Sequence, residues 1–321
     1  MPRFAKYAWG VLTYNLAVVL WGAYVRASGA GAGCGRHWPL CNGVVIPQPE
    51  RIQTLIEFTH RIMSGVALLL VIGLVVWSRA APRGHPARGG ALASLGFMLS
   101  EALVGAWLVL YRLVEHDASM TRAVSLSVHL VNTFLLLAAL GLTAWWASGG
   151  PRVGLRGRGA LPWLVAAGLA GTLAVGMTGA VAALGDTLFP SSSLLGGLRE
   201  DASPTAHLLI RLRVLHPTLA ILVGFYLLGL SLWLARAPAR GRAAALARAM
   251  GVLVLLQLLL GGLNVALLAP VWLQLVHLLA ADLVWLALVL SGAAALAEPA
   301  AVASQRGGPR GAALAGAIPT R

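Results

Sequence analysis

Eight long apolar stretches constrain the fold of this chain more than any other feature of its sequence. A helix that crosses the hydrocarbon core of a bilayer needs about 20 mostly apolar residues, and its backbone polar groups must be hydrogen-bonded internally. The stretches cover residues 8–27, 53–78, 90–111, 123–147, 161–184, 207–235, 244–268 and 271–294. We therefore predict an all-α integral membrane protein with eight transmembrane helices.

Composition supports this prediction and excludes other classes of protein. Charged residues make up only 11% of the chain, whereas a soluble domain has about 25%. The net charge of +14 would favour a nucleic-acid partner in a soluble chain. Here the charges lie in short loops between apolar stretches, so we expect membrane lipid and no nucleic acid around this protein.

The distribution of basic residues predicts the orientation, because cytoplasmic loops collect Lys and Arg. With the N-terminus inside, the inner segments hold 15 of the 24 basic residues and a single acid, Glu298. The outer segments and the spans share the other nine basic and nine acidic residues. We expect a cell (plasma) membrane protein with both termini in the cytoplasm. The tail after about residue 297 is rich in Ala, Gly and Arg and is expected to be disordered.

The two halves of the chain resemble each other. Residues 22–25 match 179–182 at an offset of 157, and residues 57–61 match 213–217 and residues 101–105 match 257–261 at an offset of 156. A shared offset indicates an internal repeat. Each half holds four helices, so both have the same topology. We predict two pseudo-symmetric four-helix bundles, residues 1–150 and 151–321.

Four histidines lie inside predicted spans, each six to nine residues into an even-numbered helix: His60, His129, His216 and His277. All even-numbered helices run from outside to inside, so the four side chains are expected at one depth near the outer surface. Polar groups inside a membrane are costly and indicate function, although hydrogen bonding across helices is an alternative. The other four histidines, in loops or at a span edge, are explained by solvation.

Two imidazoles on facing helices of a bundle are typical of a bound heme. A zinc site would usually add Cys or carboxylates at ligand spacing, and a CxxCH motif for covalent heme is absent. We predict one non-covalent heme in each half. Five arginines near the outer surface are candidates to bind its propionates: Arg26, Arg61, Arg122, Arg211 and Arg213.

The two halves carry different residues three positions before the first intramembrane histidine of each half. Glu57 lies three residues before His60, on the same helix face, and the equivalent residue of the second half is Arg213. A carboxylate can take part in proton chemistry, whereas an arginine holds a propionate. The first half is therefore the predicted reactive site. The alternative is that Glu57 only pairs with Arg61 or Arg51.

Three other features are less decisive. Glu101 against Gln257 repeats the same asymmetry, and Asp282 has no assigned role beyond bridging helices. Cys34 and Cys41 lie in the first outer loop, where oxidising conditions favour a disulfide that staples a lid over the first bundle. A redox role of the two cysteines toward the substrate is the alternative.

Together these residues resemble the heme A synthase family, over nearly the whole chain to about residue 294. The resemblance rests on residues 22–26, the cysteine loop, residues 57–61, and the three later intramembrane histidines. It implies an enzyme that oxidises a methyl group of heme O to a formyl group through a hydroxymethyl intermediate. The heme A formed serves terminal oxidases. It also implies heme O synthase as a partner and an electron donor that is not identified.

The resemblance implies a role for each matched residue. His60 and His129 bracket the substrate heme, and His216 and His277 ligate a resident heme b. Glu57 matches the essential carboxylate, and Cys34 and Cys41 match the first-loop cysteine pair. Some members carry a second pair in the corresponding loop of the second half, but residues 185–206 contain no Cys.

Two rival functions remain open at this point. A bis-His electron-transfer cytochrome would bind two hemes without substrate chemistry and would need no carboxylate at position 57. A transporter or heme-handling protein is disfavoured, because the sequence shows no broken helices at matched positions of the two halves.

Overall fold

The structure is a computed structural model, and it describes residues 2–48, 51–236 and 241–297. Within these ranges it is all-helical, with eight helices or helix pairs long and apolar enough to cross a membrane. Seven of the spans are single helices: α1 (Pro2–Ala27), α2 (Ile52–Ser78), α3 (Pro86–Leu110), α4 (Met120–Ala147), α5 (Leu161–Leu188), α9 (Gly241–Ala266) and α10 (Val271–Ala295). The predicted all-α fold with eight spans is confirmed. The tail expected to be disordered lies outside the described residues from 298 onward.

The remaining span is interrupted. It consists of α7 (Leu208–Leu212) and α8 (Leu215–Ala235). Pro217 explains the break, because proline lacks an N–H and its ring clashes with the carbonyl four residues earlier, here that of Arg213. The N–H of His216 instead bonds the carbonyl of Arg213 at 3.2 Å. The loop before this span contains a short helix, α6 (Leu194–Ala202), that apolar length alone did not predict.

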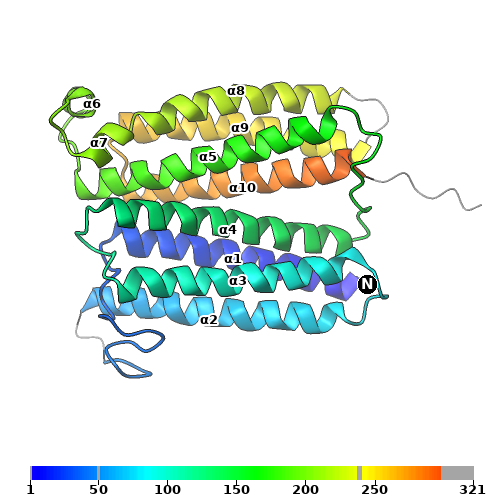
Figure 1. The fold of residues 1–321 in the computed structure, drawn as a ribbon, viewed down its shortest axis with the longest axis horizontal. Helices are drawn as coiled ribbons and strands as arrows, with labels where there is room; N and C mark the ends of the chain where they lie inside the picture. The colour runs from blue at the N-terminus through cyan, green and yellow to red at the C-terminus, as the bar shows by residue number, and fades with distance from the viewer. Residues whose placement is uncertain (1, 49–50, 237–240, 298–321) are drawn as a thin grey trace, which may run out of the picture.

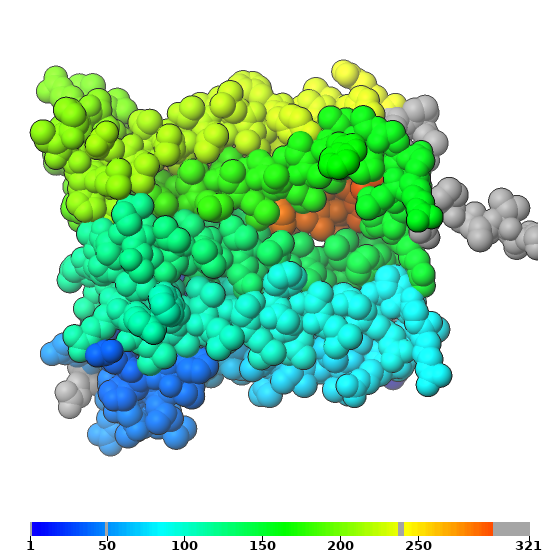
Figure 2. All heavy atoms as spheres, in the orientation of Figure 1, coloured from blue at the N-terminus to red at the C-terminus, as the bar shows by residue number. Residues whose placement is uncertain are grey.

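The spans run antiparallel to their neighbours in the chain and form two groups (Figure 1). Helices α1 to α4 pack on one another, and α5, α8, α9 and α10 pack on one another. A space-filling view shows the two groups against each other along their length (Figure 2). The division into two pseudo-symmetric domains, 1–150 and 151–321, remains a prediction.

Contacts of α4 with α5 and α10 join the two groups. The indole N–H of Trp285 on α10 donates to the carbonyl of Phe134 on α4 at 2.6 Å, and the two rings stack with centroids 5.2 Å apart. Gly141 leaves room on α4 for the side chain of Leu286. The apolar interior is therefore continuous from one group to the other.

The two ends of the molecule differ in charge. At the end where α2, α4, α8 and α10 finish, the described residues carry arginines such as Arg79, Arg152 and Arg236 and no Asp or Glu. We call this the arginine end. The opposite end holds the cysteine loop, α6 and α7 and carries acidic residues such as Asp117, Asp186 and Asp201. We call it the histidine end, since the intramembrane histidines lie nearest to it.

Candidate functional site

All four intramembrane histidines lie near the histidine end of their spans. Each is the seventh to tenth residue of a candidate span, and each side chain is half-buried. The two histidines of each half come from two different helices, α2 and α4 in the first half and α8 and α10 in the second.

In the second half the two imidazoles face each other across the group of helices. The ring centroids of His216 and His277 are 6.3 Å apart, and their planes are perpendicular at 87°. Nδ1 of His216 lies 3.2 Å from the carbonyl oxygen of Val175, a contact that fixes the ring and leaves Nε2 free. Both rings pack against glycines of neighbouring helices, Gly179 and Gly261.

The distance between these two rings matches that of two imidazoles bound to one iron. A metal–imidazole bond is roughly 2 Å long, and a ring centre lies about 1 Å behind its nitrogen, so two opposed bonds place the ring centres about 6 Å apart. The 6.3 Å observed agrees with this estimate. The described residues contain no cluster of three or more His, Cys, Asp or Glu side chains suited to a bare metal ion. A pair of histidines suits an iron whose other ligands come from a porphyrin.

Unpaired ring nitrogens support the same interpretation. Nδ1 of His60 and Nδ1 of His277 have no hydrogen-bond partner among the residues that the structure describes, whereas Nδ1 of His129 lies close to a carboxylate. A buried polar atom without a partner costs free energy in an apolar interior. Binding of an iron atom to one of these ring nitrogens would supply the missing partner.

In the first half, the two histidines have different neighbours. His60 packs against Gly22 of α1, where a Cβ atom would lie 2.9 Å from its Cε1. His129 lies beside a carboxylate instead, with Nδ1 3.3 Å from Oε1 of Glu101 on α3. Gly105 is the sequence counterpart of Gly261, but a Cβ atom on it would meet nothing within 4 Å.

Glu57 lies one turn before His60 and is only 3% exposed. Its Oε2 accepts a hydrogen bond of 2.8 Å from the backbone N–H of Cys34, and its Oε1 forms an ion pair with Arg61. Arg61 in turn donates to the carbonyl oxygens of His37 and Leu40 in the cysteine loop. The carboxylate is therefore fixed from two sides, and the pairing with Arg61 considered as an alternative is present.

The cysteine loop is docked on the first turns of α2. Cys34 and Cys41 are bonded to each other and are 0% and 1% exposed. Gly33 is needed for this approach, because a Cβ atom there would lie 2.4 Å from the carbonyl oxygen of Gln53. Thr54 donates to the carbonyl of Gly33 at 2.8 Å. Buried sulfur atoms in a docked loop favour a structural role for the pair over thiol exchange.

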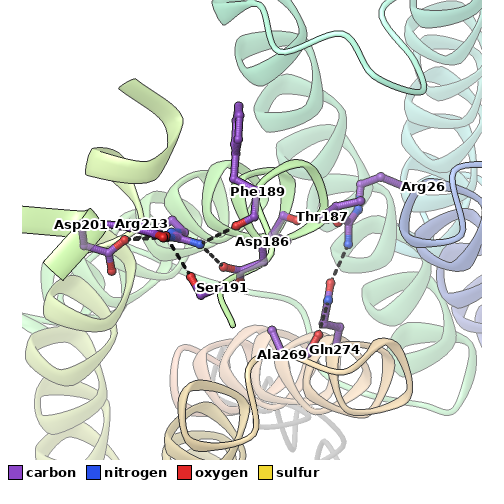
Figure 3. A network of polar contacts seen from close by, with 11 residues as sticks. Arg26, Asp186, Thr187, Phe189, Ser191, Asp201, Arg213, Ala269 and Gln274 are labelled. Atoms are coloured by element: carbon purple, nitrogen blue, oxygen red, sulfur yellow. Dashed lines mark hydrogen bonds and ion pairs between the residues drawn. The ribbon is translucent and has the colours of Figure 1, made fainter. Parts of the chain in front are cut away.

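Four of the five arginines predicted to bind propionates have partners within the protein. Figure 3 shows two of them, Arg26 and Arg213, whose partners Thr187 and Asp186 are consecutive residues of α5. Arg26 donates to the hydroxyl of Thr187 at 2.7 Å and to Gln274 of α10 at 2.9 Å. Arg213 pairs with Asp186 at 3.2 Å and with Asp201 at 2.8 Å.

The other three arginines differ from one another. Arg61 belongs to the Glu57 site, and Arg122 is buried and donates to the carbonyls of Glu115 and Asp117. Arg211 is exposed at the histidine end. Binding of propionates by the five arginines remains a prediction.

A groove of about 600 Å³ lies between α3 and α4 beside the first-half site. This volume is within the range of roughly 300–1,000 Å³ typical of small-molecule sites. The groove is lined by Val104, Trp107, Met120, Thr121, Val124, Ser125 and Val128. Ser125 lies one turn before His129, and Val104 lies one turn after Glu101, so the groove shares helix faces with both residues.

Asp282 lies on α10, five residues after His277. It is 0% exposed, and neither of its carboxyl oxygens bonds any residue that the structure describes. The bridge between helices considered from the sequence is therefore not formed among the described residues.

Several residues of the site were not predicted. The packing of Gly22 and Gly179 against histidines could have been inferred, because both belong to the repeated segments. Asn132, Thr133 and Gln274 carry no sequence signal of their own, since their roles depend on which helices become neighbours.

These observations define a polytopic helical membrane protein with paired histidines near one end of its spans. Comparison with known families assigns it further: residues 5–289 match the model of the family described as "Cytochrome oxidase assembly protein". The chain belongs to this family.

Curated proteins with two different names resemble this chain. Proteins named "Protoheme IX farnesyltransferase" from two strains of Thermus thermophilus are each 52% identical over 295 residues, covering 92% of this chain and 48% of the relative. The chain thus spans about half the length of these relatives. A protein named "Heme A synthase" from Exiguobacterium sp. is 32% identical over 133 residues, or 41% of this chain and 44% of the relative. Another with this name, from Staphylococcus saprophyticus, is 43% identical over 99 residues, or 30% and 32%.

Proposed function

We propose that this protein is a heme A synthase. It oxidises a methyl group of heme O first to a hydroxymethyl group and then to a formyl group, and the product serves terminal oxidases. Each step is a two-electron oxidation of the substituent carbon, and the first also inserts one oxygen atom. Water with an external electron acceptor, or dioxygen with an external electron donor, balances both steps. The observation that carries the proposal is that one of two histidine sites, and not the other, has a carboxylate, Glu57, fixed one helical turn before its first histidine. Membership of the cytochrome oxidase assembly family supports it.

In this proposal the first half binds the substrate. His60 and His129 hold the heme O iron, and Glu57 acts on the substituent. A carboxylate that accepts bonds from Cys34 and Arg61 is already oriented, so it can accept a proton or stabilise positive charge at the carbon without rearranging. The open groove beside Val128 offers an apolar substrate a path from the bilayer.

The second half holds heme b as a resident cofactor, ligated by His216 and His277. The cofactor supplies electron transfer. The 6.3 Å between the two rings supports this assignment. The contact of His216 with the carbonyl of Val175 orients the ring in the way that metal-binding histidines are usually oriented.

The names and lengths of the two Thermus relatives support a source for the proposed substrate, heme O. Farnesyl transfer to heme gives heme O, and the two Thermus proteins that carry this activity in their name are about twice as long as the matched region. We assign farnesyl transfer to the part of those relatives that this chain does not match. The partner of this chain is then a heme O synthase that supplies heme O.

The proposed location is the cell membrane, with both termini in the cytoplasm. The arginine end would face the cytoplasm according to the positive-inside rule. The histidine end and the cysteine loop would face the oxidising outer side, where a disulfide persists.

Pigment extraction tests the proposal. The chain is expressed in cells without their own heme A synthase, alone and together with a heme O synthase, and hemes are extracted from membranes and from the purified protein. We expect heme b with the chain alone, and heme A or the hydroxymethyl intermediate only when both proteins are present. Heme O formed by this chain alone would show farnesyl transfer instead. Heme b in both halves with unaltered heme O in the membrane would favour the electron-transfer cytochrome.

A further inference from the structure

Glu101 lies at the centre of a polar network between α3 and α4 that the proposed mechanism does not use. Its Oε1 accepts a hydrogen bond from the hydroxyl of Thr133, and its Oε2 accepts one from the amide of Asn132, each at 2.5 Å. Asn132 is held in turn by the hydroxyl of Ser100 at 2.6 Å and by the carbonyl of Phe97 at 2.9 Å. The carboxylate is therefore fixed by groups other than a histidine.

The carboxylate at the centre of this network lies next to one ring nitrogen, Nδ1 of His129. Oε1 of Glu101 lies 3.3 Å from Nδ1 of His129, and both side chains are largely shielded, at 19% and 28% exposure. A carboxylate accepts hydrogen bonds but does not donate them, so it favours the tautomer of His129 with a proton on Nδ1. The Nε2 atom is then left with its lone pair, the form that binds a metal.

The corresponding position in the second half is Gln257, which also lies beside the second histidine of its half. Its Nε2 is 3.3 Å from Nε2 of His277. The repeat thus places a side chain of similar length next to each of these histidines. It is a carboxylate at the candidate substrate site and a neutral amide at the candidate cofactor site.

We propose that Glu101 is a positioning residue for the substrate heme: it holds the imidazole of His129 with Nδ1 as the donor and Nε2 directed at the iron. This inference rests on the proposed function, in which His129 is a ligand of heme O. A carboxylate behind a ligating histidine also increases the basicity of the ligand. In the second half Gln257 contacts the other ring nitrogen of His277, Nε2, so that histidine has no carboxylate at Nδ1 to increase its basicity.

The test compares Glu101→Gln with wild type and with Glu115→Gln, a control that removes an exposed carboxylate. Each protein is purified from cells that also express a heme O synthase. Heme O plus its oxidised products is measured per heme b, and the low-spin ferric signals are recorded by electron paramagnetic resonance. Removing an outer-shell partner typically costs about 10- to 100-fold in affinity. We expect a loss of that size for heme O and a shifted first-half signal in Glu101→Gln, with heme b unchanged, and wild-type behaviour in Glu115→Gln.

A second comparison shows whether Glu101 acts through His129. Adding Glu101→Gln to His129→Ala should cause no further loss of heme O, because coupled residues are not additive. An equal further loss, or an unshifted signal with wild-type heme O content in the single variant, would overturn the proposal. If Glu101→Gln fails to retain heme b, Thr133→Val loosens the same carboxylate and should shift the first-half signal less, in the same direction. No shift there would also count against it.

The outcomes separate this inference from the proposed function. Wild-type protein that binds heme O in the first half without oxidising it would remove the enzymatic proposal and leave the positioning role intact. Normal oxidation by wild type, together with a Glu101→Gln variant that behaves like wild type, would remove the positioning role and leave the enzymatic proposal intact. A first half that binds no heme would remove both.

Discussion

The two halves of this molecule place histidines in similar positions but surround them differently. In the second half, His216 and His277 both pack against glycines and face each other at 6.3 Å. In the first half, His60 has a glycine neighbour, whereas His129 has a carboxylate, and Gly105 has open space beside it. These surroundings support the proposal that the second half retains its ligand. The first half has more room beside Gly105 and a carboxylate beside His129, which supports the proposal that it exchanges its ligand.

The helix that carries the first histidine of each half also differs. α2 is continuous through Glu57, His60 and Arg61, so the acid and the histidine share a face. The equivalent span of the second half breaks between α7 and α8 at Pro217. Because the break has no counterpart in α2, it does not create the matched pair of broken helices typical of transporters.

Replacing Glu57 with Gln should give the largest difference between the halves. The variant keeps the size of the side chain but cannot act as a base, and loss of general-base catalysis typically costs about 100- to 10,000-fold in rate. We expect normal heme b, accumulated heme O or hydroxymethyl intermediate, and very little heme A in extracted pigments. Wild-type heme A in this variant would reduce Glu57 to a structural partner of Arg61.

Alanine substitution of the histidines tests the assignment of each heme to a half. His216→Ala and His277→Ala should lose heme b by at least the roughly 10- to 100-fold that removing a supporting group costs. His60→Ala should keep heme b and lose heme O. Reduced-minus-oxidised spectra and heme extraction measure both. Unchanged heme b in both second-half variants would show that the cofactor binds elsewhere.

The glycine contacts allow a matched steric test. Gly179→Val places methyl groups against His216, and overpacking of this kind typically costs about 1–3 kcal/mol. Gly105→Val introduces the same side chain where the structure has no atom within 4 Å. Heme b per protein should fall several-fold in Gly179→Val and stay near wild type in Gly105→Val. Equal heme b in the two variants would contradict the packing described for His216.

The cysteines should have the smallest effect, confined to the first half. A disulfide that closes a loop with a sequence separation of 7 is expected to contribute about 2.4 kcal/mol, toward the lower end of the usual range. Cys34→Ser with Cys41→Ser should lower yield or heme A a few-fold while heme b changes less. Thiol labelling of wild type without reductant should fail. Rapid labelling of both cysteines in intact cells would contradict either the disulfide or the proposed orientation.

Sequence alone could predict the spans and part of the site because both depend on local periodicity. Apolar length located every span, and helical spacing placed Glu57 beside His60 and Arg61. The break before α8 was missed because apolar length continues across Pro217. The bond from the backbone of Cys34 to Glu57 was missed because every residue except proline has an N–H. The contact of Glu101 with His129 depends on the packing of two helices, and only the Glu–Gln difference indicated it.

The bonds of Arg26 have a consequence for how the membrane protein is assembled. Arg26 lies at the end of α1, the first of the eight spans in chain order, and its acceptors lie on α5 and on α10, the eighth span. A guanidinium near the membrane interior is costly until it has partners. The first helix therefore reaches its final set of bonds only after the eighth has been inserted. The first group of helices therefore cannot complete its bonds as a separate unit, because Arg26 needs acceptors from the second group.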